Sequence, residues 1–207
     1  MSETTKEFLT NLYIKNSRIP KRYIPKISLA PTTENDLVSF KRLKAIEDNI
    51  VKFVQMHQNL LISSNEVGNG KTTWATRILK SYIYNYAYQF AYDNNTPVLY
   101  LNVPEYLSFK KRTISNPELL QEVNKIEDCI YSSKIVLFDD IATKLASDYD
   151  KELLYCYINS RTDNLLTSIY TTNISVNALD EAIGERVADR LIGYSVCIEL
   201  NGASRRY

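Results

Sequence analysis

This chain of 207 residues is poor in the residue types that build metal sites. It has one histidine, His57, and three cysteines, Cys129, Cys156 and Cys197, which lie far apart and form no C-x-x-C pair. Such a set does not favour structural zinc, which takes four clustered Cys or His ligands. We expect the cysteines to be free thiols in a reducing cytosol.

The sequence also lacks long hydrophobic runs. No segment approaches the ~18 apolar residues that indicate a membrane-spanning helix, and the first residues lack the apolar core of a signal peptide. We therefore expect a cytoplasmic protein with no membrane partner. Hydrophobic residues make up 44% and charged residues 24%, which is typical of globular proteins. With a net charge of +1, any binding of nucleic acid requires a local basic patch.

Residues 1–50 differ in composition from the rest. They hold three of the six prolines, within the basic stretch RIPKRYIPKISLAP (18–31). Proline fixes φ and lacks an N–H, so this stretch predicts an extended arm rather than a helix. Apolar residues at helical spacing then predict one helix over 34–58. We interpret 1–50 as an N-terminal arm and helix, a candidate partner-binding segment, and 51–207 as the main domain.

From residue 59 onward, short apolar runs alternate with longer helical stretches. This alternation is typical of a parallel sheet covered by helices on both faces. Amphipathic helices are expected over 117–131 and 150–164. Five strands are expected, over 59–64, 97–103, 134–139, 168–172 and 194–200.

Only five glycines occur in the chain, and two of them, Gly68 and Gly70, lie in SSNEVGNGKTTWA (63–75). This stretch nearly matches the phosphate-loop motif G-x-x-x-x-G-K-[ST], with Asn65 in place of the first glycine. Asparagine tolerates left-handed backbone geometry better than other non-glycine residues, so we expect the turn to survive. The stretch follows a predicted strand, and it therefore predicts binding of ATP or ADP.

In this interpretation backbone amides of residues 67–72 surround the phosphates. Lys71 contacts the β- and γ-phosphates, and the Thr72 hydroxyl binds Mg²⁺. Such a loop opens into a helix, so we predict a helix over 71–92, although its aromatic residues alternate as in a strand. The predicted nucleotide-binding residues of the loop are Asn65, Val67, Gly68, Asn69, Gly70, Lys71, Thr72 and Thr73.

Two carboxylates end the predicted strand 134–139. Downstream of a phosphate loop, such a pair is typical of the acidic strand of a P-loop ATPase. Asp139 would support Mg²⁺, and Asp140 would orient or deprotonate the attacking water. Many P-loop ATPases have Glu at this second position, and the shorter Asp leads us to expect modest turnover. Asn173 follows the next strand and either positions the γ-phosphate or water, or begins a turn.

Two basic groups are further candidates. Arg186 and Arg190 lie four residues apart in GERVADRL, hence on one helix face. They either pair with surface acids or supply charge to the γ-phosphate of a neighbouring subunit. The second group is either a solvated helix end or a track for single-stranded DNA, because it combines basic residues with an aromatic ring. It consists of Phe109, Lys110, Lys111 and Arg112.

Together these residues resemble the DnaC/DnaI-type replicative helicase loaders of the AAA+ class, particularly short bacteriophage versions. The resemblance spans 19–207. It implies a three-layer P-loop AAA+ core with a five-stranded parallel sheet and without the C-terminal helical lid. The ATPase domain would cover 51–207. The motifs that carry the resemblance are RIPKRY, SNEVGNGKTTWA, VPEYL, IVLFDDI, LLYCYINSRTDNLLTSIYTTN, GERVADRL and NGASRRY.

The resemblance implies a slow ATPase, using ATP or ADP with Mg²⁺ and stimulated by assembly or DNA. It would self-associate into a ring or helical oligomer and place a ring-shaped replicative helicase on single-stranded DNA. Asn173 would be the first sensor, and Arg190 the inter-subunit finger with Arg186 close behind. Arg205 or Arg206 would be the second sensor, with Arg206 favoured.

Three other functions remain open at the level of sequence. An ATPase helper of insertion-sequence transposition has nearly the same core but would bind duplex DNA and a transposase. A weakly hydrolysing nucleotide-binding adaptor would occupy a host replication protein. A small-molecule P-loop kinase would need an Arg-rich lid and an acceptor pocket, and the sequence indicates neither.

Overall fold

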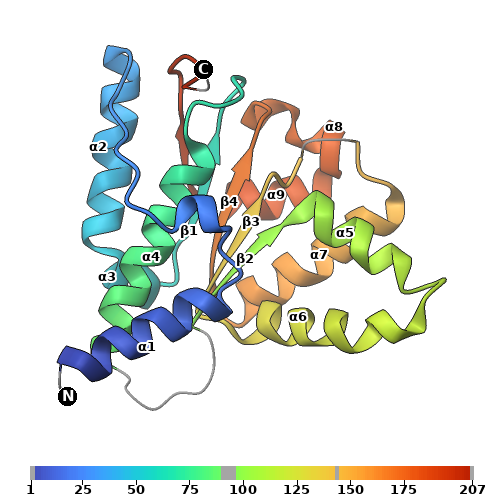
Figure 1. The fold of residues 1–207 in the computed structure, drawn as a ribbon. Helices are drawn as coiled ribbons and strands as arrows, with labels where there is room; N and C mark the ends of the chain where they lie inside the picture. Colours follow the sequence, from blue (N-terminus) through green and yellow to red (C-terminus); the bar gives the residue numbers. More distant parts are fainter. Residues whose placement is uncertain (1–2, 90–96, 143–144, 206–207) are drawn as a thin grey trace.

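The computed structural model describes residues 3–89, 97–142 and 145–205. Within them, a parallel sheet of five strands runs in the order β2-β3-β4-β1-β5 between layers of helices (Figure 1). The predicted parallel α/β sheet and its five strands are confirmed. Their bounds are Asn59–Ser63 (β1), Val98–Asn102 (β2), Ile135–Asp139 (β3), Thr167–Thr172 (β4) and Ser195–Glu199 (β5).

Helices cover both faces of the sheet, and each face has its own hydrophobic cluster. The first cluster involves α1 (Glu3–Asn16), α2 (Glu34–Asp48), α3 (Ile50–Gln55) and α4 (Lys71–Gln89). The second involves α5 (Val103–Arg112), α6 (Leu120–Ser132), α7 (Asp148–Asp163), α8 (Leu179–Ile183) and α9 (Glu185–Gly193). Short 3₁₀ helices are η1 (Lys21–Tyr23), η2 (Pro117–Leu119) and η3 (Val176–Ala178). None of the helices in the described residues is long and apolar enough to cross a membrane.

Burial on both faces explains why the strands are continuous apolar runs. Successive side chains of a strand point to opposite faces, so Leu60 and Ile62 join the first cluster while Leu61 joins the second. The same alternation holds for β3. The parallel register also aligns the carboxyl ends of the strands, since Asn102 pairs with Asp139.

The single helix predicted over 34–58 is wrong: the chain forms α2 and α3, with a break at Asn49. The Asn49 side-chain amide donates to the carbonyl of Ala45 at 2.9 Å, and such local bonds compete with helix continuation. His57, with a φ of 54°, then turns the chain into β1. The helix predicted over 117–131 begins as the 3₁₀ turn η2 before α6.

The aromatic stretch that follows the phosphate loop is helical through Gln89, as predicted. Tyr82 and Tyr86 are buried four residues apart, whereas Tyr84 is half exposed. That spacing is the helical period, and it decides against the strand that simple alternation suggests. The last predicted helical residues, 90–92, lie outside the described residues.

The N-terminal residues pack against the rest of the chain. Tyr13 and Phe40 belong to the same hydrophobic cluster as Leu60. The sequence predicted an extended arm. The arm instead contains the short helix η1, which begins directly after Pro20. The role of this segment in partner binding stays a prediction.

A buried lysine fixes the arm to α4. The Lys80 ammonium donates to three successive carbonyl oxygens of the arm, those of Tyr23 at 2.5 Å, Ile24 at 3.0 Å and Pro25 at 3.1 Å. Burial lowers the pKa of Lys80. The arm is thereby held on the same helix that opens with the phosphate loop.

Arg161, from the INSRTDN motif, is a fully buried link between α7 and the sheet. Its guanidinium donates to Ser168 Oγ at 2.9 Å and to the carbonyl oxygens of Ile130 at 2.6 Å and Ser133 at 3.0 Å. Arg161→Leu would leave these buried acceptors unpaired, and we expect it to lower the free energy of unfolding by about 3 kcal/mol or more. Urea denaturation measures this. The exposed Arg42→Leu is the control, with an expected change within about 0.5 kcal/mol. Equal effects of the two substitutions would contradict the prediction.

Candidate nucleotide-binding site

The predicted phosphate loop joins β1 to α4, with Lys71 as the first residue of the helix. Gly68 and Gly70 have φ values of 85° and 103°, which few other residues adopt. A Cβ at Gly70 would also lie only 3.3 Å from Leu29 Cδ2. The backbone geometry therefore favours glycine at position 70, and a side chain there would also crowd Leu29.

Asn65 does not adopt the left-handed backbone geometry that was expected to preserve the turn. Asn65 is not among the residues with positive φ in the described chain. The turn after β1 is instead stabilised by Ser64, whose hydroxyl accepts the Glu66 N–H at 3.0 Å. An ordinary backbone conformation at position 65 needs no glycine, so the departure from the motif costs the loop little.

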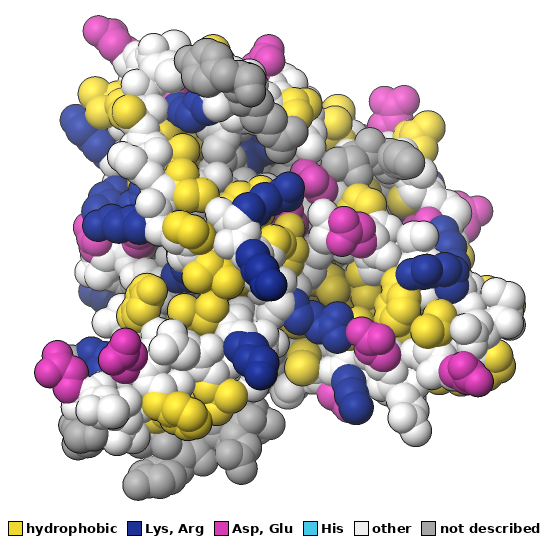
Figure 2. Space-filling view, viewed as in Figure 1, with side chains coloured by type: hydrophobic (Ala, Val, Ile, Leu, Met, Phe, Trp, Pro, Cys, Tyr) yellow, Lys and Arg dark blue, Asp and Glu magenta, His cyan; other side chains and the backbone are white. Residues whose placement is uncertain are grey.

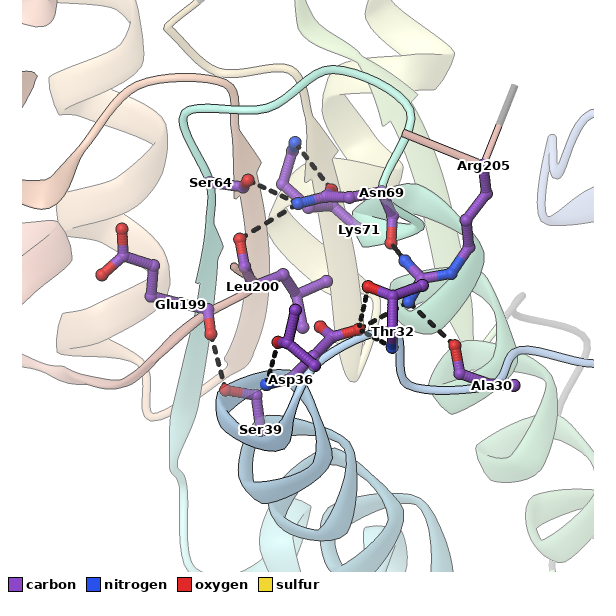
Figure 3. A network of polar contacts seen from close by, with 11 residues as sticks. Ala30, Thr32, Asp36, Ser39, Ser64, Asn69, Lys71, Glu199, Leu200 and Arg205 are labelled. Atoms are coloured by element: carbon purple, nitrogen blue, oxygen red, sulfur yellow. Dashed lines mark hydrogen bonds and ion pairs between the residues drawn. The ribbon is translucent and has the colours of Figure 1, made fainter. Parts of the chain in front are cut away.

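Lys71 is buried within the loop, with 5% of its surface exposed. Its ammonium donates to the Glu66 carbonyl oxygen at 2.8 Å and to Asn69 Oδ1 at 3.2 Å. The Asn69 amide in turn donates to the Leu200 carbonyl oxygen at 3.0 Å (Figure 3). Lys71 therefore already lies where the loop would surround a phosphate.

Asp139 ends β3 and is buried among three hydroxyl donors. Its Oδ1 accepts from Thr72 at 2.8 Å and Thr171 at 2.6 Å, and its Oδ2 accepts from Tyr100 at 2.7 Å. These donors come from α4, β4 and β2, so the carboxylate joins the phosphate loop to the edge of the sheet. Burial, and then the Asp139 charge, raise the pKa of Tyr100, which therefore remains a donor.

This donor set fits the Mg²⁺ of a nucleotide complex. Mg²⁺ prefers oxygen ligands and takes many of them from phosphates and water, so that one carboxylate and a hydroxyl suffice from the protein. Thr72 and Asp139 offer that pair at the end of the loop. No cluster of three or more His, Cys, Asp or Glu side chains forms a metal site in the described part of the chain.

Asp140 and Asn173 lie together beside the loop. Asp140 has a φ of 59°, and its N–H donates to Thr171 Oγ1 at 2.9 Å. The Asn173 amide donates to Asp140 Oδ1 at 2.9 Å. Both line the same cavity as the phosphate loop. The predicted base and first sensor are thus in direct contact, although their roles stay predictions.

The cavity measures about 480 Å³. Sequence reasoning missed that the arm forms one of its walls, because it assigned the arm to partner binding. The motif RIPKRY, at the start of the resemblance, was the available signal. The arm contributes Arg22, Tyr23, Ile27, Ser28 and Leu29 to the lining.

Of the two candidates for the second sensor, Arg205 lies within the described residues and Arg206 does not. Arg205 lines the cavity, and its guanidinium donates to the Ala30 carbonyl oxygen at 2.9 Å and to Asp36 Oδ2 at 2.6 Å. It also donates to the Asn69 carbonyl oxygen of the loop. Arg206, which the sequence favoured, lies outside the described residues.

Arg186 and Arg190 do not line this cavity. Arg186 is exposed on α9, with its guanidinium carbon 4.0 Å from the centroid of the Tyr155 ring. Arg190 donates to the Tyr194 hydroxyl at 3.1 Å. Both guanidinium groups lower the pKa of the Tyr155 hydroxyl, with Arg186 the larger cause. The two arginines therefore form one cluster, separate from the nucleotide cavity of their own chain.

The predicted DNA-binding group is partly neutralised. Lys110 pairs with Glu127, and Lys111 pairs with Asp150 at 2.6 Å. The Arg112 guanidinium lies 5.3 Å from the centroid of the Phe109 ring. Figure 2 shows basic and acidic side chains interspersed on this face rather than one continuous basic surface. DNA binding stays a prediction.

No protein-family profile and no curated protein matches the sequence. Solved structures do match. The crystal structure of the DnaC helicase loader aligns with a TM-score of 0.69 and 19% identity, over 88% of this chain and 100% of the other. The chain therefore has the fold of the solved DnaC structure. The crystal structure of DnaI aligns with a TM-score of 0.66 and 16% identity, over 91% of this chain and 95% of that one.

A replication initiator, DnaA, has a related fold. Its structure with AMPPCP and single-stranded DNA aligns at a TM-score of 0.60 and 16% identity, over 83% of this chain and 48% of the DnaA chain. The present chain thus spans about half of that DnaA. The DnaC-type fold confirms the family resemblance at the level of fold.

Proposed function

We propose that this protein is an ATP-dependent loader that places a ring-shaped replicative helicase on single-stranded DNA. One observation carries the proposal: Thr72, which follows Lys71 in the loop, donates its hydroxyl to Asp139 at the carboxyl edge of a DnaC-type sheet. Two solved proteins with this fold are DnaC, described as a helicase loader, and DnaI. The same fold supports self-association into a ring or helical oligomer as part of the proposal.

The shape of the cavity supports ATP or ADP as its ligand. The phosphate loop lines one part, and the aromatic and aliphatic side chains of Tyr23, Ile27 and Leu29 line the arm side. An apolar wall suits a flat base, and a glycine-containing loop at a helix N-terminus suits phosphates. The DnaA that shares the fold was solved with AMPPCP, an ATP analogue.

Hydrolysis would proceed by attack of water on the γ-phosphorus, with cleavage of its bond to the bridging oxygen and release of ADP and phosphate. Asp140 accepts the proton of the water, and Asn173 orients the Asp140 carboxylate through its 2.9 Å hydrogen bond. Bound Mg²⁺, held by Thr72 and Asp139, would offset charge on the phosphates. Because Asp140 is short and engaged with Asn173, we propose slow turnover that assembly or DNA stimulates.

Asp140→Asn is expected to retain ATP binding but to lower the rate of hydrolysis about 10²- to 10⁴-fold. The amide has the shape of the carboxylate but cannot accept a proton. Phosphate release at saturating ATP measures the rate, and titration with a fluorescent ATP analogue measures binding. Asp148→Asn, at an exposed position of α7, is the control. Wild-type turnover in Asp140→Asn would show that Asp140 is not the base.

Arg112 is expected to contribute more to single-stranded DNA binding than Lys110 or Lys111, whose charges are already paired with carboxylates. Arg112→Ala should reduce the slope of log affinity against log salt by about 0.7, the value for one phosphate contact on a single strand. Lys111→Ala is the matched control and should change the slope little. Fluorescence anisotropy with a labelled oligonucleotide measures both. An unchanged slope in Arg112→Ala would show that this group is an ordinary solvated surface and does not bind DNA.

The partner is tested by affinity capture from a host lysate in the presence of ATP. We expect a replicative helicase to be recovered with the wild-type protein and lost with Lys71→Ala, since capture would depend on bound nucleotide. Recovery of a transposase in its place would support the transposition helper. Recovery of neither partner would contradict the loader.

A further inference from the structure

The segment that follows β5 lies across the phosphate loop. The Arg205 N–H donates to the Gly68 carbonyl oxygen at 2.9 Å, and the Leu200 carbonyl oxygen accepts from the Asn69 amide at 3.0 Å. Residues more than a hundred positions apart in the sequence are therefore bound to each other around the loop (Figure 3).

The Arg205 side chain joins three segments. Its guanidinium donates to the carbonyl oxygen of Asn69 in the loop, to that of Ala30 in the arm at 2.9 Å, and to Asp36 Oδ2 of α2 at 2.6 Å. Its Nη1 lies 3.6 Å from where a Cβ of Gly70 would be. The guanidinium thus packs against the loop and lines the cavity.

Asp36 is the anchor of this arrangement. Its side chain is fully buried, and its Oδ2 also accepts from the Thr32 N–H at 3.0 Å. Its Oδ1 is buried with no hydrogen-bond partner among the described residues. A buried carboxylate is costly unless it is paired, so Asp36 strongly favours keeping Arg205 in place. Gly202 allows the fit, because a Cβ there would lie 2.5 Å from Asp36 Oδ2.

We propose that Asp36 is a positioning residue of the nucleotide site, acting through Arg205. Arg205 binds two successive loop carbonyls, those of Gly68 and Asn69. Because each peptide unit is planar, fixing these carbonyls also fixes the N–H groups of Asn69 and Gly70. Those N–H groups belong to the loop that would bind the phosphates, so Asp36 holds the loop ready for nucleotide. This inference rests on the proposed binding of ATP.

The test compares the affinities for ATP and ADP of Asp36→Asn, Arg205→Gln and the double variant. Each single variant should lower the affinity for both nucleotides about ten-fold. The affinity of the double variant should be no lower than that of the single variant that binds less tightly. The kcat at saturating ATP should change less than about two-fold in Asp36→Asn, because Asp36 prepares the loop but does not touch the reacting atoms.

Thr33→Ala is the matched control for a merely structural effect. Thr33 caps α2 by accepting the Asp36 N–H at 3.1 Å, so its loss weakens the same helix while leaving the Asp36–Arg205 pair intact. Its nucleotide affinity should equal that of the wild type. Equal losses in Thr33→Ala and Asp36→Asn would overturn the proposal, because helix stability alone would explain them.

If Asp36→Asn fails to fold, the double variant still decides the test, because replacing both residues leaves no unpaired buried charge. Wild-type affinity in the folded double variant would overturn the positioning role. Failure of the wild-type protein itself to bind ATP would instead refute the proposed function, and this inference with it. The two failures are thereby distinguished by the wild-type titration.

Discussion

Lys71→Ala is expected to lower the affinity for ATP about a hundred-fold or more. The ammonium of Lys71 is almost fully buried inside the loop, where it bonds to the Glu66 carbonyl oxygen at 2.8 Å. A triphosphate bound in the loop would bring several negative charges into a site with low exposure to water. Hydrogen bonds to charged groups contribute about 1.5–3 kcal/mol each, and their loss leaves the phosphate charge poorly compensated. Titration with a fluorescent ATP analogue measures the change.

Lys52→Ala is the control for this prediction, because Lys52 is an exposed lysine on α3. It removes the same charge from the protein without touching the cavity. Affinity close to that of the wild type in Lys71→Ala would show that the loop is not the nucleotide site. Lys71→Ala should unfold at a temperature similar to the wild type in the absence of nucleotide, since Glu66 and Asn69, which accept from its ammonium, both belong to the loop.

The sheet could be predicted from sequence because its signals are local. A strand buried on both faces is an uninterrupted apolar run, and β3 shows this with four buried apolar residues before Asp139. The loop could be predicted because glycine is scarce in this chain and two of its glycines have positive φ there. Asp139 and Asn173 could be predicted to lie near the loop because each follows or ends a predicted strand, and the carboxyl ends of parallel strands meet at one edge.

The sequence could not show the contacts between distant segments. Lys110 and Lys111 look like an exposed basic group, but their carboxylate partners lie 17 and 39 residues further along the chain. The arm looks like a free peptide, but Lys80 binds it through three carbonyl oxygens, which no composition reveals. Arg161 belongs to a motif in the sequence, but only its hydrogen bonds to Ile130 of α6 and Ser168 of β4 show that it links helices to the sheet.

Arg190→Ala is expected to bind ATP normally and to lose about 10³-fold or more of the hydrolysis that appears on assembly. Phosphoryl transfer needs a positively charged group beside the γ-phosphate in addition to Lys71 and Mg²⁺. Arg190 does not line the cavity of its own chain, and its guanidinium is held beside Tyr194 on α9. We therefore expect Arg190 to contact the ATP that is bound by a neighbouring subunit. ATPase rates as a function of protein concentration measure the effect.

A mixing experiment separates a finger that acts in trans from a residue that merely stabilises its own chain. Arg190→Ala retains the phosphate loop but lacks the finger, whereas Lys71→Ala lacks nucleotide but retains the finger. Mixed together, they should regain part of the turnover, because the Lys71 variant contributes Arg190 to the ATP bound by its neighbour. Full activity in Arg190→Ala with loss in Arg186→Ala would transfer the role to Arg186, which lies on the same face of α9. Full activity in both variants would show that no arginine of this cluster acts in trans, and the protein would then have to complete its site from within one chain.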